Sequence, residues 1–217
     1  AASDVYKRQA LTSDQVVSLT ASQVAALETL DLRALNTDGI AAMGTDRIAA
    51  LTASQAAALT NAQVQALTDT QMAALTTANI RAMGTAQFAV ISSTQVEGLG
   101  TAQVAALETA DLRAMSTTAV AQLSTAQIRA LGTEHVAGLS TAQVANLTTE
   151  QVAALETADI RAMVSAQFAA LTTAQAEALS TEQIAAIETL DLRQLTTQAV
   201  AVLSLSLIHI SEPTRPL

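Results

Sequence analysis

Apolar residues recur along this chain every eight residues, and a second apolar row follows the first by five. Position 1 of the octad holds Leu, Met or Ile from Leu11 to Leu203, and position 6 is apolar from Val16 onward. Position 8 is nearly always Ala, and position 5 is mostly Gln. A fixed period of this kind predicts an array built from one small structural unit.

A single continuous helix does not fit this spacing. At 100° per residue an octad advances by about 800°, so the apolar stripe would drift by about 80° in each repeat. A β-solenoid fits poorly too, since positions 1 and 6 differ in parity and would point to opposite faces of a strand. The Ala and Gln between them favour helix over strand. The pattern therefore predicts one short helix per octad.

Serine and threonine residues at positions 2 and 3 are the expected helix starters. We favour position 3 as the N-cap, with positions 4 to 8 and the next position 1 helical. The alternative register puts the cap at position 2, where Ser/Thr-x-x-Gln becomes a capping box. Under the favoured register, position 2 is a joint suited to a left-handed C-cap residue, and it holds Gly44, Gly84, Gly100 and Gly132. Acidic residues at position 4 suit a first helical turn: Asp38, Asp46, Glu134, Glu150 and Glu182.

Helices of about six residues are unstable alone, because nucleation costs more than so few hydrogen bonds return. Neighbours must stack, which predicts an all-α, elongated α-solenoid with positions 1, 6 and 8 in a continuous core. The sequence leaves the number of helices per turn open, and two helices per layer serves as a working assumption. At position 6, Phe168 and Ala176 lie one octad apart, which suggests that a large and a small side chain share core space.

A longer period of 80 residues overlies the octad. Residues 20–99 align with 100–179, and 180–203 begin a third copy. The unit Glu-Thr-x-Asp-Leu-Arg marks these copies at 28–33, 108–113 and 188–193, and a related unit with Ile lies at 156–161. We interpret its Asp and Arg as surface ion pairs between adjacent layers, each contributing ~0–1 kcal/mol. The solenoid is assigned to residues 10–204.

Both ends of the chain differ from the array. The runs Asp4-Val5-Tyr6-Lys7-Arg8-Gln9 and Ser206-Leu207-Ile208-His209-Ile210 resemble peptides translated from sequencing-adapter DNA in metagenomic assemblies. That resemblance implies non-native tails at 1–9 and 205–217. The repeat itself resembles the Ala-Gln-Val-Ala-Ala-Leu-Thr-Thr arrays of large, often secreted or surface bacterial proteins. This second resemblance implies an extracellular or cell-surface location.

Candidate chemistry in the array is sparse. The chain has no cysteine, and its formal net charge is −9. An acidic array repels nucleic acid and anionic membrane, so neither is expected as a partner, and no apolar run is long enough for membrane insertion. His135 is the only histidine in the array, and a metal site needs several convergent ligands. We expect no catalytic, cofactor-binding or metal-ligating residues, and hence no enzyme.

The sequence leaves three functional hypotheses. The preferred one is a non-catalytic structural spacer or interaction segment of a larger surface or secreted protein. The second is a solenoid that binds an as yet unknown protein or glycan through a face bearing Arg33, Arg81, Arg113, Arg161 and Arg193. The third is an ice-binding threonine ladder at position 3. A capping role for position 3 would argue against the ladder, because a capping hydroxyl is turned into the backbone of its own helix.

Overall fold

The described part of the chain is built from short helices. The structure, a computed structural model, describes residues 12–203, so the tails predicted at 1–9 and 205–217 lie outside it. Helices are the only regular elements in this range, with one helix in each octad. The all-α solenoid predicted from the octad is therefore confirmed. Two compact units, residues 1–122 and 123–217, divide the chain, and each is described by itself.

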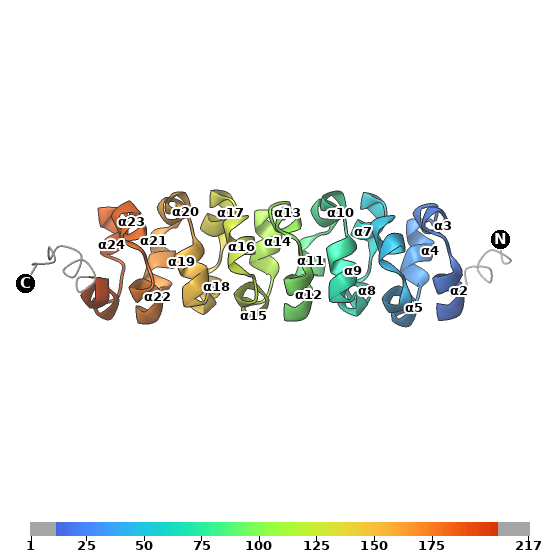
Figure 1. The fold of residues 1–217 in the computed structure, drawn as a ribbon, viewed down its shortest axis with the longest axis horizontal. Helices are drawn as coiled ribbons and strands as arrows, with labels where there is room; N and C mark the ends of the chain where they lie inside the picture. The colour runs from blue at the N-terminus through green and yellow to red at the C-terminus, as the bar shows by residue number, and fades with distance from the viewer. Residues whose placement is uncertain (1–11, 204–217) are drawn as a thin grey trace, which may run out of the picture. The chain divides into compact units, whose positions relative to one another are not determined.

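The helices of the first unit are α2 (Ser13–Ser18), α3 (Ala21–Ala25), α4 (Thr29–Ala34), α5 (Thr37–Ala42), α6 (Thr45–Ala49), α7 (Ala53–Ala58), α8 (Asn61–Ala66), α9 (Asp69–Ala74), α10 (Thr77–Ala82), α11 (Thr85–Phe88), α12 (Ser93–Gly98), α13 (Thr101–Val104), α14 (Thr109–Ala114) and α15 (Thr117–Ala121). Those of the second unit are α16 (Thr125–Arg129), α17 (Thr133–Gly138), α18 (Thr141–Asn146), α19 (Thr149–Ala154), α20 (Thr157–Ala162), α21 (Ser165–Ala170), α22 (Thr173–Glu177), α23 (Thr181–Ala186) and α24 (Thr189–Leu192), followed by helical residues 197–203. Figure 1 shows how sharply each helix turns into the next.

Each helix begins after position 2 of its octad, so the favoured position-3 cap is wrong and the alternative register is correct. In α10 the cap is Thr76, whose hydroxyl accepts a hydrogen bond from the backbone N–H of Asn79 at 3.1 Å. The side-chain oxygen of Asn79 accepts from the N–H of Thr76 at 2.8 Å, which completes a capping box. This reciprocal pair satisfies two orphan donors, more than a position-3 cap without a partner would satisfy.

The position-2 glycines are also N-caps, so the predicted left-handed C-cap is wrong. Gly44, Gly84, Gly100 and Gly132 have φ values of −68°, −112°, −74° and −86°. No described residue has a positive φ. The chain leaves each helix instead through an extended residue at position 1, such as Leu75 with φ −61° and ψ 138°. Two extended residues, at positions 1 and 2, therefore form each joint.

Helix n packs against helix n + 3, which makes three stacks in each unit. In the first unit these are the α2 stack (α2, α5, α8, α11, α14), the α3 stack (α3, α6, α9, α12, α15) and the α4 stack (α4, α7, α10, α13). In the second unit they are the α16 stack (α16, α19, α22), the α17 stack (α17, α20, α23) and the α18 stack (α18, α21, α24). One turn of the solenoid thus contains three octads, and the assumed two-helix layer is wrong.

The core contains positions 1 and 6 as predicted, but position 5 takes the place that we gave to position 8. Phe168 and Ala176 at position 6 are 1% and 0% exposed. Among the described residues at position 8, only Ala106, Ala154 and Ala186 are buried. Small residues at position 8 nevertheless permit close approach, since a Cβ added at Gly98 of α12 would collide with the backbone of Asp69 in α9.

We predict that the two threonines at the start of α10 differ sharply in their effect on stability. Thr76→Ala should lower the free energy of unfolding by about 1 kcal/mol, because it removes the cap. Thr77→Ala is the matched control: Thr77 is exposed at the first helical residue, and its loss should change stability by less than about 0.5 kcal/mol. Urea denaturation of both variants measures this. A larger loss for Thr77 than for Thr76 would contradict the observed register.

Candidate functional site

Glutamine side chains at position 5 form the most regular polar feature of the structure. Gln71 on α9 is 2% exposed. Its Oε1 accepts from the backbone N–H of Thr68 at 2.8 Å, at the start of its own helix. Its Nε2 donates to the carbonyl oxygens of Ile40 and Met43, each at 2.8 Å, where α5 ends and the chain turns into α6. One side chain thus satisfies orphan groups of one helix N-terminus and one helix C-terminus.

The same bridge recurs at fixed sequence separations. In each case Nε2 donates to the carbonyl 28 residues earlier, at position 1, over 2.6–2.9 Å. The bridging pairs are Gln55–Leu27, Gln63–Leu35, Gln71–Met43, Gln87–Leu59, Gln95–Leu67, Gln103–Leu75, Gln151–Leu123, Gln167–Leu139, Gln175–Leu147 and Gln183–Leu155. We call this arrangement the glutamine bridge. Sequence reasoning missed it, although the constancy of Gln at position 5 was its signal.

Residues that replace Gln at position 5 keep part of the bridge. Asn79 is shorter and reaches only the position-1 carbonyl, that of Leu51, at 2.8 Å. Arg47 donates from Nε to the carbonyl of Leu19, also 28 residues earlier. His135 accepts from the N–H of Gly132 through Nδ1 at 3.0 Å. These contacts assign His135 a role in capping α17.

Two of the four aspartates at position 5 are buried, and an aspartate lacks the amide donor of glutamine. Asp111 on α14 is 2% exposed and Asp159 on α20 is 3% exposed. Asp111 Oδ2 is buried without a hydrogen-bond partner, while Asp159 Oδ2 accepts from the N–H of Glu156 at 2.9 Å. Burial raises the pKa of Asp111, and the nearby carboxylate of Glu108 acts in the same direction. Burial also raises the pKa of Asp159, against a smaller opposing effect of the Glu156 backbone hydrogen bond. The surface Asp–Arg pairing predicted for this motif therefore does not describe Asp111 or Asp159.

The five candidate arginines are exposed, and they lie on several stacks rather than one face. All occupy position 7. In the first unit Arg33 and Arg81 belong to the α4 stack, on α4 and α10, whereas Arg113 on α14 belongs to the α2 stack. In the second unit Arg161 belongs to the α17 stack, and Arg193 follows α24 of the α18 stack. Within the first unit Arg33 and Arg81 share a stack, with α7 between them, and Arg113 does not.

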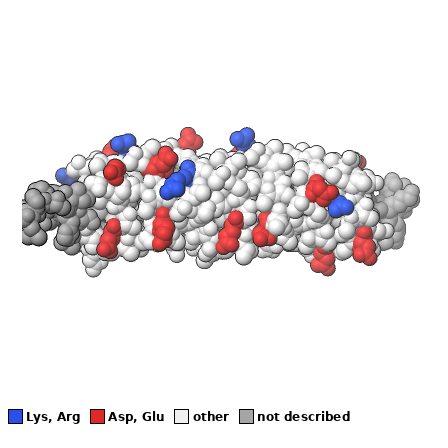
Figure 2. Space-filling model, viewed as in Figure 1, with Lys and Arg blue, Asp and Glu red and all other residues white. Residues whose placement is uncertain are grey.

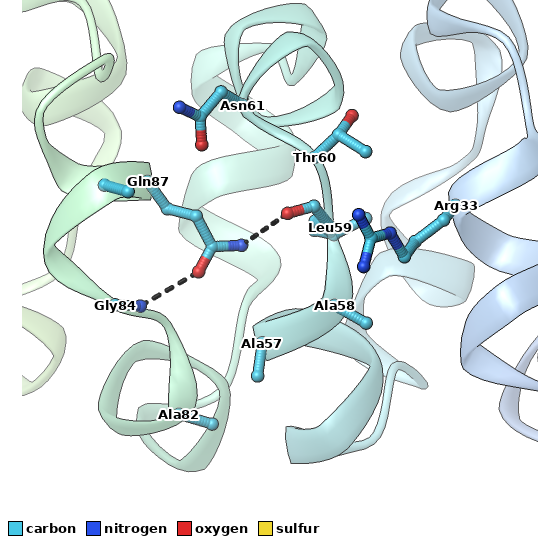
Figure 3. A pocket seen from close by; sticks show the side chains of 10 residues that line it. Arg33, Ala57, Ala58, Leu59, Thr60, Asn61, Ala82, Gly84 and Gln87 are labelled. Carbon is cyan, nitrogen blue, oxygen red and sulfur yellow. Dashed lines mark hydrogen bonds between the residues drawn. The ribbon is translucent and has the colours of Figure 1, made fainter.

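Arg33 borders an open surface groove of about 490 Å³ in the first unit (Figure 3). The lining residues are mostly small: Ala57, Ala58, Ala82, Gly84 and Ala86, with Leu59, Thr60, Asn61 and Gln87. Gln87 is committed to a glutamine bridge, since its Nε2 donates to Leu59 at 2.8 Å and its Oε1 accepts from Gly84 at 2.9 Å. The hydroxyl of Thr60 caps α8. The guanidinium of Arg33 and the amide of Asn61 remain as the polar groups that could contact a ligand.

Charged side chains are scattered over the visible surface. Figure 2 shows acidic and basic residues spread over the visible face, some alone and some as an acidic residue beside a basic one, with uncharged surface between them. The ion pair formed within residues 12–203 joins neighbours on one helix, Arg47 and Asp46, at 3.7 Å. In the same range no three His, Cys, Asp or Glu side chains converge as metal ligands. None of the described helices is long and apolar enough to cross a membrane.

The stacked octads define a repeat protein of the short-helix α-solenoid class. The family described as the ALTTAQ repeat matches residues 24–61, 77–109, 104–141, 128–155 and 152–186, which together make up more than half of the chain. The chain therefore belongs to the ALTTAQ repeat family. No curated protein matches it.

We predict that removing one bridge destabilises the array strongly. Gln71→Leu should lower the free energy of unfolding by about 2–5 kcal/mol, because each buried polar group left without a partner costs roughly 1–3 kcal/mol. Gln65→Leu, at an exposed position 7 on α8, is the control and should change stability by less than about 0.5 kcal/mol. Urea unfolding followed by circular dichroism compares the two. Equal effects would show that the bridge contributes nothing beyond packing.

Proposed function

We propose that this array is a non-catalytic structural spacer or interaction segment of a larger bacterial protein that is exported or displayed on the cell surface. The observation that supports it most is the recurrence of one bridge at a constant separation of 28 residues. A unit that bonds only to the preceding turn can be added or removed without redesigning its neighbours. Such an array suits a segment whose role is set by its number of octads.

Surface display can be tested on intact cells of the source bacterium. An antibody raised against residues 12–203 should label unpermeabilised cells, and external protease should abolish the signal. An antibody against a cytosolic protein controls for lysis. Labelling that requires permeabilisation would contradict the exported location, while the complete reading frame would show whether an export signal and flanking domains accompany the array.

A ligand-binding role through the arginines is the first alternative. The groove beside Arg33 supports it, because a cation next to an amide can bind an anionic protein or glycan group. Arg33→Ala should then remove binding on a glycan or protein array, while Arg113→Ala, on another stack, should not. Equal loss in both variants would indicate general electrostatic attraction.

A threonine ladder is the second alternative, and the observed register removes the argument against it. Position-3 hydroxyls do not cap the helices, because position 2 does. In the second unit the α17 stack has Thr133, Thr157 and Thr181 in this position, and none of the three is buried. Thermal hysteresis of the purified chain tests ice binding. Activity that is lost when these threonines become serine would support the ladder, and absence of hysteresis in the parent chain would exclude it.

A further inference from the structure

The buried aspartates at position 5 occupy a place where the rest of the solenoid requires a hydrogen-bond donor. Asn79 is the isosteric reference, because an Asp side chain has the same shape. Asn79 Oδ1 accepts from the N–H of Thr76 at 2.8 Å, and its Nδ2 donates to the carbonyl of Leu51, 28 residues earlier, at 2.8 Å. The two copies of the 80-residue block differ here, since Asp159 stands in the second where Asn79 stands in the first.

The same separation of 28 residues pairs Asp111 with the carbonyl of Met83, and Asp159 with that of Leu131. Within the described chain neither carbonyl accepts a hydrogen bond, although the matching carbonyls beside glutamines do. Asp111 Oδ2 is buried without a partner. An ionised carboxylate has only acceptors, so it cannot donate a hydrogen bond to a carbonyl oxygen. A protonated carboxyl supplies the missing O–H.

We propose that Asp111 and Asp159 are proton-binding joints: each takes up a proton in the folded chain and donates it in a hydrogen bond to the position-1 carbonyl of the preceding turn. In Asp111 the proton lies on Oδ2, the oxygen without a partner. In Asp159 it lies on Oδ1, because Oδ2 accepts from the N–H of Glu156. The protonated side chain then reproduces the contacts of Asn79, and the turn is closed.

The ionisable side chains on the elements around each buried aspartate are mostly exposed. In the first unit α11, which packs against α14, has no ionisable side chain, and α10 has the exposed Arg81. Glu108 and Arg113 lie on the segment of Asp111 itself and are also exposed.

In the second unit α20 packs against α17, with Glu134 and His135, and against α23, with Glu182. Arg129 lies two residues before Leu131, whose carbonyl is paired with Asp159. Glu156 and Arg161 lie in the same octad as Asp159. Of these groups only His135 is half-buried, and the others are exposed.

The pH dependence follows from the sign of the change. A carboxyl whose pKa is raised on folding stabilises the fold fully below its unfolded pKa, which is about 3.9 for Asp. That contribution is lost as the pH rises through the higher folded pKa. Glu150 and Glu182 act in the opposite sense, since backbone hydrogen bonds lower their pKa. The stability of the parent chain therefore mixes both effects, and only a comparison with variants isolates the joints.

The test measures the urea midpoint of the full chain and of the double variant Asp111→Asn, Asp159→Asn between pH 3 and pH 7. The variant has a permanent donor at both joints. Its midpoint should exceed that of the parent at pH 7, and the two midpoints should coincide at pH 3. Asp38→Asn, which neutralises an exposed carboxylate on α5, is the charge control. It should not show a midpoint above that of the parent at pH 7 that disappears at pH 3.

A second measurement follows the protons directly. Carboxyl ¹³C chemical shifts should give Asp111 and Asp159 apparent pKa values above about 3.9. The proposal is overturned if the variant gains nothing at pH 7, if its advantage persists at pH 3, or if both carboxyls titrate at or below the ordinary value. It is also overturned if added Na⁺ or Ca²⁺ at pH 7 raises the parent midpoint to that of the variant, because the joint would then bind a cation.

Discussion

The fold depends on how very short helices provide hydrogen-bond partners for the backbone N–H and carbonyl groups at their ends. An α-helix leaves four N–H groups and four carbonyl groups without intrahelical partners, and a helix of four to six residues has few others. The position-5 glutamine meets part of this need at both ends, with Oε1 on the N-terminus of its own helix and Nε2 on carbonyls of the preceding turn. Apolar burial at positions 1 and 6 drives the stacking, and the glutamine bridge fixes how each turn is aligned with the preceding one.

The register explains how surface residues are distributed. Three octads form a turn, whereas the sequence repeats in blocks of ten octads, and ten is not a multiple of three. Equivalent residues of successive blocks therefore fall on different stacks. Arg33 and Arg113 illustrate this within the first unit, on α4 and α14. A partner that recognised this motif could approach the unit from more than one side.

Much of the fold could be predicted from the octad, because the spacing of Leu and Val alone excludes one long helix and a strand. The cap register was left between two alternatives, since Thr76 and Thr77 are equally good helix starters. The capping-box partner at Asn79, three residues after Thr76, was the sequence signal for the correct one. Burial of Gln71 was missed because a polar side chain is expected at the surface unless its partners are known. Those partners lie 28 and 31 residues away, a distance that local patterns do not report. The distribution of the arginines over different stacks could not be predicted either, because it depends on the number of helices per turn.

Hydrogen exchange of glutamine side-chain amides, measured by NMR, tests the central claim most directly. The Nε2 protons of bridging residues such as Gln63, Gln71 and Gln175 should be protected at least about tenfold relative to the exposed Gln65 and Gln122. Gln15 and Gln23 are exposed within the first described turn and should exchange as fast as Gln65. Equal exchange rates at bridging and exposed glutamines would contradict the claim that buried position-5 amides join successive turns of the solenoid.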